Sequence, residues 1–272
     1  MRCARLLPWI LIAASMGVHA DEDAAQVQRD LIDAQVARIS TEPAEAGRVF
    51  FLGFAGHGDE RVFAEEIKLA AQRVGEKYGS SARTVLLLND RRDLSTWPLA
   101  SESSLRYSLN ALARVMNLDE DVLFLALSSH GSADATLNVS NTGMTPQALS
   151  ANVLASLLGE SGIRWKVVVV SACYSGAFIK PLADNQTIVI TAAAKNRTSF
   201  GCSDQRDLTY FGEAFYRDSL PGSTHLRGAV DAATREIRRR EKEEDVRPSQ
   251  PQAYFGPLME EKLRGIEQAQ VR

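Results

Sequence analysis

Two side chains that could together carry out nucleophilic catalysis each follow an apolar run in the sequence. Cys173 stands just after the β-branched run 167–170, within VSACYSG, and His130 follows the apolar run 122–127, within SSHGS. A cysteine is nucleophilic only as a thiolate, and a nearby imidazole can take its proton and later protonate a leaving amine. The pair therefore indicates acyl-transfer chemistry at a peptide bond.

Backbone N–H groups beside these two side chains could stabilise the oxyanion that such a reaction develops. Gly131 follows the histidine directly and lets the backbone approach a substrate closely, and the N–H of Cys173 is the natural second donor. Each donor of this kind is worth about 2.7–4 kcal/mol to the transition state. Nucleophile, acid/base and oxyanion donors thus form one candidate catalytic set.

The elements that must position these residues are five apolar runs that alternate with helical stripes. Continuous apolar runs are typical of strands covered on both faces, and their alternation with helices favours a mostly parallel sheet. The predicted fold class is α/β, with a mostly parallel sheet sandwiched between helices in three layers. Ligands bind beyond the carboxyl ends of such strands, so neighbouring strands would bring His130 and Cys173 into one crevice. The predicted strands are residues 49–55, 85–88, 122–127, 167–170 and 187–191.

Apolar residues at helical spacing predict the connecting helices. One helix is expected to begin at Thr145-Pro146, with the threonine hydroxyl as its cap and the proline in its first turn. Segment 21–47 and the tail after Gly256 are expected to be amphipathic helices. The remaining helical stripes lie at 63–74, 105–116, 210–216 and 226–237.

The first twenty residues are predicted to be a secretory signal peptide. MRCAR supplies two positive charges, an apolar run too short for a membrane span follows, and Val18-His19-Ala20 fits a signal-peptidase site. Cleavage before Asp21 would export the protein to the periplasm or the extracellular space. A retained membrane anchor is the alternative. Later stretches are not apolar enough to span a bilayer, so no stable membrane insertion is expected.

The composition excludes a strongly charged partner surface. The formal net charge is -3 over 272 residues, which gives no electrostatic footprint for nucleic acid or an anionic membrane.

Removal of the signal would leave Cys173 and Cys202 in an oxidising compartment, where disulfides form. A bridge between them would make the chain a non-catalytic binding module. Otherwise Cys202 is a small buried residue or a reversible redox brake on Cys173.

The quoted motifs resemble those of a known family. SSHGS and VSACYSGAF resemble the two active-site motifs of the legumain family of cysteine peptidases, which share the caspase-type fold. ITAAAKNRTSFGC resembles the loop after the next strand in that family, and FLGFAGHGDER resembles its first strand and loop. The resemblance covers roughly residues 48–220. It implies that Cys173 is the nucleophile, His130 the general acid/base, and Gly131 with Cys173 the oxyanion donors.

The activity that this resemblance implies is secreted endopeptidase hydrolysis through a Cys173 thioester, with a peptide or protein as substrate. Some relatives pass the acyl group to an amine, so a transamidase or peptide ligase is the alternative. Ser129 stands where legumain has an acidic residue before the catalytic histidine, which weakens the ligase interpretation. The implied organisation is a signal peptide at 1–20, an N-terminal helical segment at 21–47, a caspase-like peptidase domain at 48–256 and a C-terminal tail at 257–272.

The resemblance also implies a set of substrate-binding residues. Arg61 aligns with the arginine of the family's substrate pocket, and Thr198 or Ser199 with its hydroxyl residue. Ser171 takes the place of an acidic residue, and Val62 that of a histidine. The resemblance therefore does not decide whether this chain shares the asparagine preference of legumains, and the preferred residue is left open.

One further histidine lies near the predicted catalytic edge. His57, in AGHGD at the end of the first strand, could reach the same face and is interpreted as an ordinary loop histidine. His57 and Asp59 have no further ligands at zinc spacing along the chain. We therefore predict neither a metal site nor a cofactor.

Overall fold

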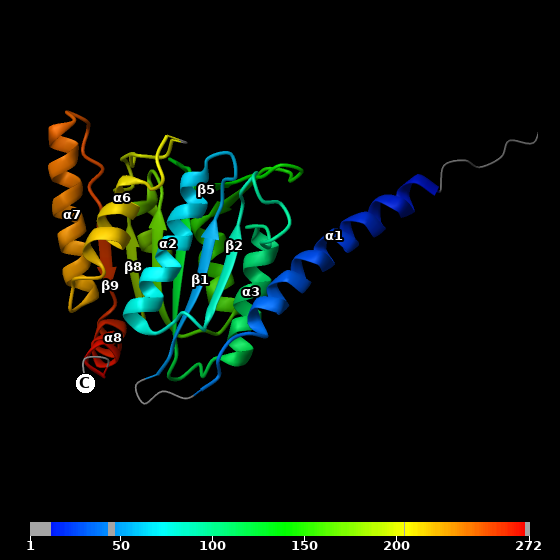
Figure 1. Cartoon of the computed structure of the whole chain (residues 1–272), viewed down its shortest axis with the longest axis horizontal. Helices are drawn as coiled ribbons and strands as arrows, with labels where there is room; N and C mark the ends of the chain where they lie inside the picture. Colours follow the sequence, from blue (N-terminus) through cyan, green and yellow to red (C-terminus); the bar gives the residue numbers. More distant parts are fainter. Residues whose placement is uncertain (1–11, 43–46, 204, 270–272) are drawn as a thin grey trace, which may run out of the picture.

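A six-stranded sheet forms the centre of the protein (Figure 1). The computed structural model describes residues 12–42, 47–203 and 205–269. The strand order is β2-β1-β3-β7-β8-β9, and every neighbouring pair is parallel except β8 with β9. The strands are β1 (Val49–Ala55), β2 (Thr84–Leu88), β3 (Val122–Ser128), β7 (Trp165–Ser171), β8 (Thr187–Thr191) and β9 (Gln252–Phe255).

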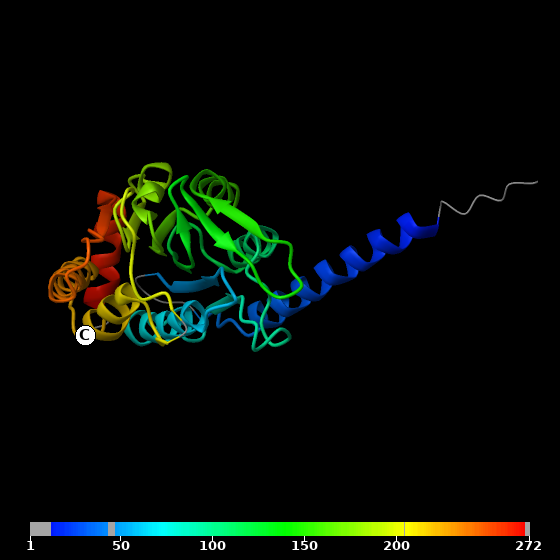
Figure 2. The ribbon, with the colours of Figure 1, turned by 90° about the horizontal axis from the view of Figure 1, so that it is seen from above.

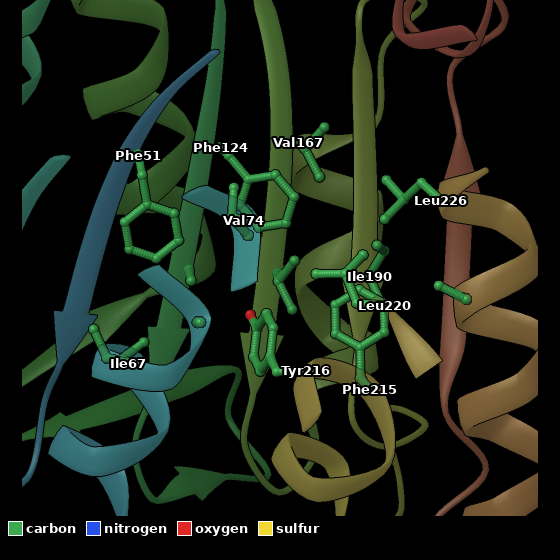
Figure 3. Close-up of a cluster of buried hydrophobic side chains, with 14 of the residues drawn as sticks. Phe51, Ile67, Val74, Phe124, Val167, Ile190, Phe215, Tyr216, Leu220 and Leu226 are labelled. Atoms are coloured by element: carbon green, nitrogen blue, oxygen red, sulfur yellow. The ribbon is translucent and has the colours of Figure 1, made fainter. Parts of the chain in front are cut away.

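Helices cover both faces of this sheet, which explains why its strands are continuously apolar (Figure 2). Alternate residues of one strand enter different cores, so that Phe51 faces one helical layer and Phe50 the other. The Phe51 core, shown in Figure 3, includes Phe124 stacked at a centroid distance of 6.0 Å. Its helical layer consists of α2 (Arg61–Tyr78), α6 (Tyr210–Gly212), the π-helix η2 (Glu213–Ser219), α7 (Leu226–Glu243) and α8 (Pro257–Ala269).

The opposite core is closed by helices from the first two-thirds of the chain. It contains buried side chains of α1, α3 and α4, together with the short helical segments that follow β7. Both layers confirm the predicted three-layer α/β fold. The bounds of these elements are α1 (Ile12–Val36), α3 (Glu102–Val115), α4 (Ala151–Glu160), the 3-10 helix η1 (Ser175–Phe178) and α5 (Ile179–Leu182).

A small antiparallel sheet follows β3 and corrects one predicted helix start. It consists of β4 (Gly131–Ser132), β5 (Thr136–Val139) and β6 (Gln147–Ser150). No helix begins at Thr145-Pro146, because the residues that follow them form β6 and pair with β5, so this prediction is wrong. Helix α4 begins only afterwards, because the Ser150 hydroxyl accepts a hydrogen bond from the N–H of Val153 at 3.1 Å.

Helix α1 meets the rest of the protein at the sheet edge. Its first part projects away from the body (Figure 1), whereas Ile32 near its end is buried. The side-chain amide of Gln35 donates to the carbonyl of Leu86 at 3.1 Å and accepts from its N–H at 2.9 Å. These bonds satisfy part of the open edge of β2, which would otherwise present unpaired backbone groups.

The predicted signal peptide lies only partly within the described residues. Residues 1–11 of this segment are outside them, and residues 12–20 form the start of α1, which continues through the predicted cleavage position. Among the helices of the described residues, none has both the length and the apolar character that crossing a bilayer requires.

Candidate active site

The two predicted catalytic residues lie beyond the ends of neighbouring parallel strands. Ser128, the last residue of β3, pairs with Ser171, the last residue of β7. One further bond, from the N–H of Ser129 to the carbonyl of Ser171 at 3.2 Å, carries this pairing beyond the strands. His130 and Cys173 each follow two residues after the paired serines, so they lie at the same edge of the sheet, as expected. The strand order reverses between β1 and β3 at this edge, where ligand sites of open α/β sheets form.

A tight turn presents the Cys173 side chain. Tyr174, the next residue, has φ 57°, a left-handed conformation that is uncommon for a residue with a side chain. Its N–H donates to the carbonyl of Arg197 at 2.7 Å, and the N–H of Gly176 donates to the carbonyl of Ala193 at 2.8 Å. The turn is therefore held against the loop that follows β8.

Gly131 lies directly against the backbone of Cys173. A Cβ atom at Gly131 would come within 2.0 Å of the carbonyl oxygen of Cys173, a distance that side-chain carbons do not adopt. Only glycine allows the two loops to approach this closely. The two predicted oxyanion donors consequently belong to adjoining stretches of backbone.

The Cys173 sulfur is held in an environment that favours the thiolate. The N–H of Ser199 donates to Sγ at 3.2 Å. Hydrogen bonding from the Cys202 thiol is the largest cause that lowers the pKa of Cys173, to about 6. Burial opposes this shift, while the Ser199 N–H and the charge of His130 add to it. These surroundings therefore favour the thiolate of Cys173, which is the reactive form.

Cys202 acts as a hydrogen-bond donor to Cys173 and not as its disulfide partner. Both cysteines are free thiols. The interaction with Cys173 and burial raise the pKa of Cys202, so it keeps its proton. The alternative of a non-catalytic binding module required a Cys173–Cys202 disulfide, and this structure does not contain that disulfide.

Replacing Cys202 by alanine is expected to raise the pKa of Cys173, because it removes the largest cause of the lowered value. The rate of alkylation by iodoacetamide follows the thiolate fraction, so it should rise with pH through a midpoint near 6 in the wild type. In Cys202→Ala the midpoint should move to higher pH. Mass spectrometry of the peptide that contains Cys173 would measure this.

Cys202→Ser is the matched control, because its hydroxyl retains a donor at the same position. The midpoint in this variant should stay closer to that of the wild type. An unchanged midpoint in Cys202→Ala would contradict the assigned role of the second thiol.

His130 lies against residues of the loop after β1. Its Nε2 is 3.3 Å from Oε2 of Glu60, and that oxygen is also 2.7 Å from Nδ1 of His57. The ring of Phe63 packs edge-on against His130 at a centroid distance of 4.9 Å. The imidazole is thus fixed on one side by an apolar ring and faces a carboxylate on another, with 37% of its side chain still exposed.

The four predicted substrate-binding residues differ in their surroundings. Arg61, the first residue of α2, is partly exposed and forms an ion pair with Asp207. Ser199 lies against the nucleophile through its backbone, and Thr198 beside it is exposed. Ser171 is buried beneath the site, where its hydroxyl is 3.4 Å from that of Thr209. Ser199 therefore contacts the Cys173 sulfur, and the Ser171 side chain is buried against Thr209 two residues before the nucleophile. Arg61 and Thr198 are more exposed.

A buried carboxylate below the site was not foreseen from the sequence. Glu66 of α2 is fully buried and accepts a hydrogen bond from the hydroxyl of Thr209. Burial raises its pKa, and hydrogen bonding with Ser171 and Thr209 partly opposes the rise. An acidic group thus lies beside Ser171 after all, although a different element supplies it. Its position on the apolar stripe of α2, four residues after Val62, was the available signal.

Comparison with known proteins agrees with this geometry. A mostly parallel sheet between two helical layers, with histidine and cysteine at the ends of adjacent strands, defines the class of caspase-like cysteine peptidases. The fold is similar to that of the crystal structure of caspase-1 from Spodoptera frugiperda, with a TM-score of 0.55 and 10% sequence identity over 77% of this chain and 87% of that chain.

Within that class, the family can be stated from the sequence match. The model of the Peptidase C13 family matches residues 106–261. The chain therefore belongs to this family, the legumain family of cysteine peptidases, which confirms the resemblance seen in its motifs. Among curated proteins, none matches the chain.

Proposed function

We propose that the chain is an exported cysteine endopeptidase that hydrolyses peptide bonds through a thioester on Cys173, with His130 as general acid and base. The observation that carries the proposal is the register of β3 and β7, which places both residues at one sheet edge. The lowered pKa of the Cys173 thiol supports it, because a lower pKa favours the thiolate that acts as nucleophile.

The mechanism begins with attack of the Cys173 thiolate on the carbonyl carbon of a bound peptide. The N–H groups of Gly131 and Cys173 stabilise the oxyanion, and their adjoining backbones support this pairing. His130 gives a proton to the amine as the C–N bond breaks, which leaves a thioester. His130 then takes a proton from water, the resulting hydroxide attacks the thioester, and the free acid and the thiolate are released.

The substrate side chain before the cleaved bond is proposed to lie among Arg61, Ser171, Thr198 and Ser199. Ser199 contacts the sulfur through its backbone, so the pocket would begin at the nucleophile. The charge of Arg61 is shared with Asp207, and the carboxylate of Glu66 is buried behind Ser171. The pocket therefore differs from that of legumains, in which the residue at the position of Ser171 is itself acidic. The preferred substrate side chain is a quantity to measure.

Export is the part of the proposal that rests on the N-terminal pattern of charges, apolar residues and Val18-His19-Ala20. Protein recovered from an export compartment is expected to begin at Asp21. N-terminal sequencing of the secreted form would show this directly.

Endopeptidase hydrolysis predicts cleavage within the chains of a mixed peptide library. Products identified by mass spectrometry should be internal fragments with free carboxyl termini, because water is the acyl acceptor. The library would also give the residue preferred before the cleaved bond. Release of terminal residues alone would contradict endopeptidase action.

An added amine nucleophile separates hydrolysis from transfer. With hydroxylamine or glycine amide present, a hydrolase should still yield mainly free acids. Conjugated products as the dominant species would instead identify a transamidase that uses the same two side chains.

A further inference from the structure

We propose that His57, Glu60 and His130 form a Zn²⁺ site beside the nucleophile, and that the bound ion reversibly inhibits the peptidase. Each side chain offers one ligand atom, and these atoms all lie within 4.8 Å of one another. Oε2 of Glu60 is 2.7 Å from Nδ1 of His57 and 3.3 Å from Nε2 of His130. One carboxylate oxygen therefore lies between two imidazole nitrogens.

Two of these ligand atoms have no hydrogen-bond partner within the part of the chain that the structure describes. Nδ1 of His57 and Oε2 of Glu60 are both buried, and their short separation lacks the geometry of a hydrogen bond. A buried polar group without a partner costs about 1–3 kcal/mol. A cation satisfies both atoms at once, because each can direct a lone pair at the ion.

The donor set is one that Zn²⁺ prefers. Two imidazoles and one carboxylate are a common set of three protein ligands, with a fourth position open to water. Bonds of about 2.0–2.2 Å in a tetrahedral arrangement place ligand atoms about 3.3 Å apart. The separation of the Glu60 oxygen from Nε2 of His130, 3.3 Å, matches this value, and its separation from Nδ1 of His57, 2.7 Å, is shorter, so a bound ion would move these two atoms apart. Imidazole ligands favour zinc over magnesium or calcium, which take oxygen ligands.

The backbone holds both histidine-bearing loops in place before any ion binds. The N–H of Asn138 donates to the carbonyl of His130 at 2.9 Å. Ser140, two residues further on, forms a β-bridge with His57, and its N–H donates to the carbonyl of Gly56 at 2.9 Å. The same short segment thus fixes both loops. Preorganised ligands require less ordering when the ion arrives.

The sequence pattern predicted no metal site, because His57 and Asp59 lack further ligands at zinc spacing along the chain. The fold supplies these ligands differently: Glu60 directly precedes the first residue of α2, and His130 follows the end of β3. Ligand spacing along the chain therefore gives no indication of this group, which forms only when β1 and β3 pair.

Inhibition follows from the identity of the third ligand. An ion on Nε2 of His130 occupies the imidazole that must transfer protons, so turnover stops while Cys173 stays chemically intact. This consequence rests on the proposed function, whereas the binding of the metal does not. A chelator should restore activity.

Isothermal titration calorimetry with Zn²⁺ alone tests the site on the full chain carrying Cys173→Ala, which has lost its nucleophile. One ion per chain is expected to bind. His57→Ala in this background should weaken Zn²⁺ binding at least about tenfold. Mutations of residues that only support metal ligands already lower metal affinity by about this factor, so the loss of a ligand should cost no less. Glu60→Gln should act in the same direction, which provides a second variant if the first folds poorly.

His225→Gln is the matched control. Nδ1 of His225 is 2.9 Å from Oε2 of Glu267, so this is a histidine–carboxylate pair outside the proposed site. It does not belong to the group of three, and its loss should leave the affinity for Zn²⁺ unchanged. Equal affinity with and without His57 would overturn the proposal.

Two further readouts distinguish this site from metal binding by the catalytic pair itself. Co²⁺ bound to the wild-type chain should give an absorption spectrum without a near-ultraviolet sulfur-to-metal charge-transfer band, and such a band would overturn the proposal. Loss of Zn²⁺ binding on Cys173→Ala would also overturn it. In the activity assay, His57→Ala should need at least tenfold more Zn²⁺ for half-inhibition than the wild type. A metal-free chain without peptidase activity would refute the proposed function and leave the binding result standing.

Discussion

Replacing Cys173 by alanine is expected to reduce peptide cleavage at least about 10⁴-fold, because the variant has no atom that can form the thioester. The library substrates that the wild type cleaves provide the measurement, under conditions in which kcat/KM is determined for both chains. Cys173 directly precedes a turn that backbone hydrogen bonds hold in place, and it is only partly buried, so the substitution leaves most of the packing unchanged. The thermal midpoint should therefore stay within a few degrees of the wild-type value.

The second thiol gives this experiment its control. Cys202→Ala removes a neighbouring cysteine of similar burial, which is a donor and not the nucleophile. It should retain measurable turnover, with an activity profile displaced to higher pH. Turnover at the wild-type rate in Cys173→Ala would end the assignment of this residue as nucleophile, whatever Cys202→Ala does.

The sheet could be predicted from the sequence because burial on both faces leaves a strong local signal. The predicted strands at 49–55 and 187–191 coincide with β1 and β8, and the other three differ at their ends by one or two residues. β9 was missed because it is short, partly exposed and lies at the sheet edge. β4 to β6 were missed for a similar reason, since two to four residues carry no usable periodicity.

The catalytic pair was predictable for the same reason, since both residues follow buried strands whose pairing places them together. What surrounds the pair was not predictable, because those contacts come from distant parts of the chain. The sequence left Cys202 as a disulfide partner, a redox brake or a small buried residue, whereas in the fold its thiol lowers the pKa of Cys173. Glu60 reaches His130 from a helix start 70 residues earlier. Neither role follows from spacing alone.

Replacing His130 by alanine is expected to lower the turnover rate by about 10²–10⁴-fold, the usual contribution of general acid–base catalysis. The thiol should nevertheless stay reactive. The charge of His130 is only a minor cause of the lowered pKa of Cys173, whereas the Cys202 thiol and the Ser199 N–H remain in the variant. Alkylation of Cys173 should therefore continue, with its midpoint moved only modestly to higher pH.

This separation of turnover from alkylation is the result that identifies an acid/base residue. A residue that only kept the site folded would, on removal, reduce both quantities together. His225→Gln again serves as the control, because its partner Glu267 belongs to α8, far along the chain from both catalytic motifs. Near-wild-type cleavage by His130→Ala would show that another group transfers the proton, and Glu60, whose carboxylate lies 3.3 Å from Nε2 of His130, would be the next residue to test.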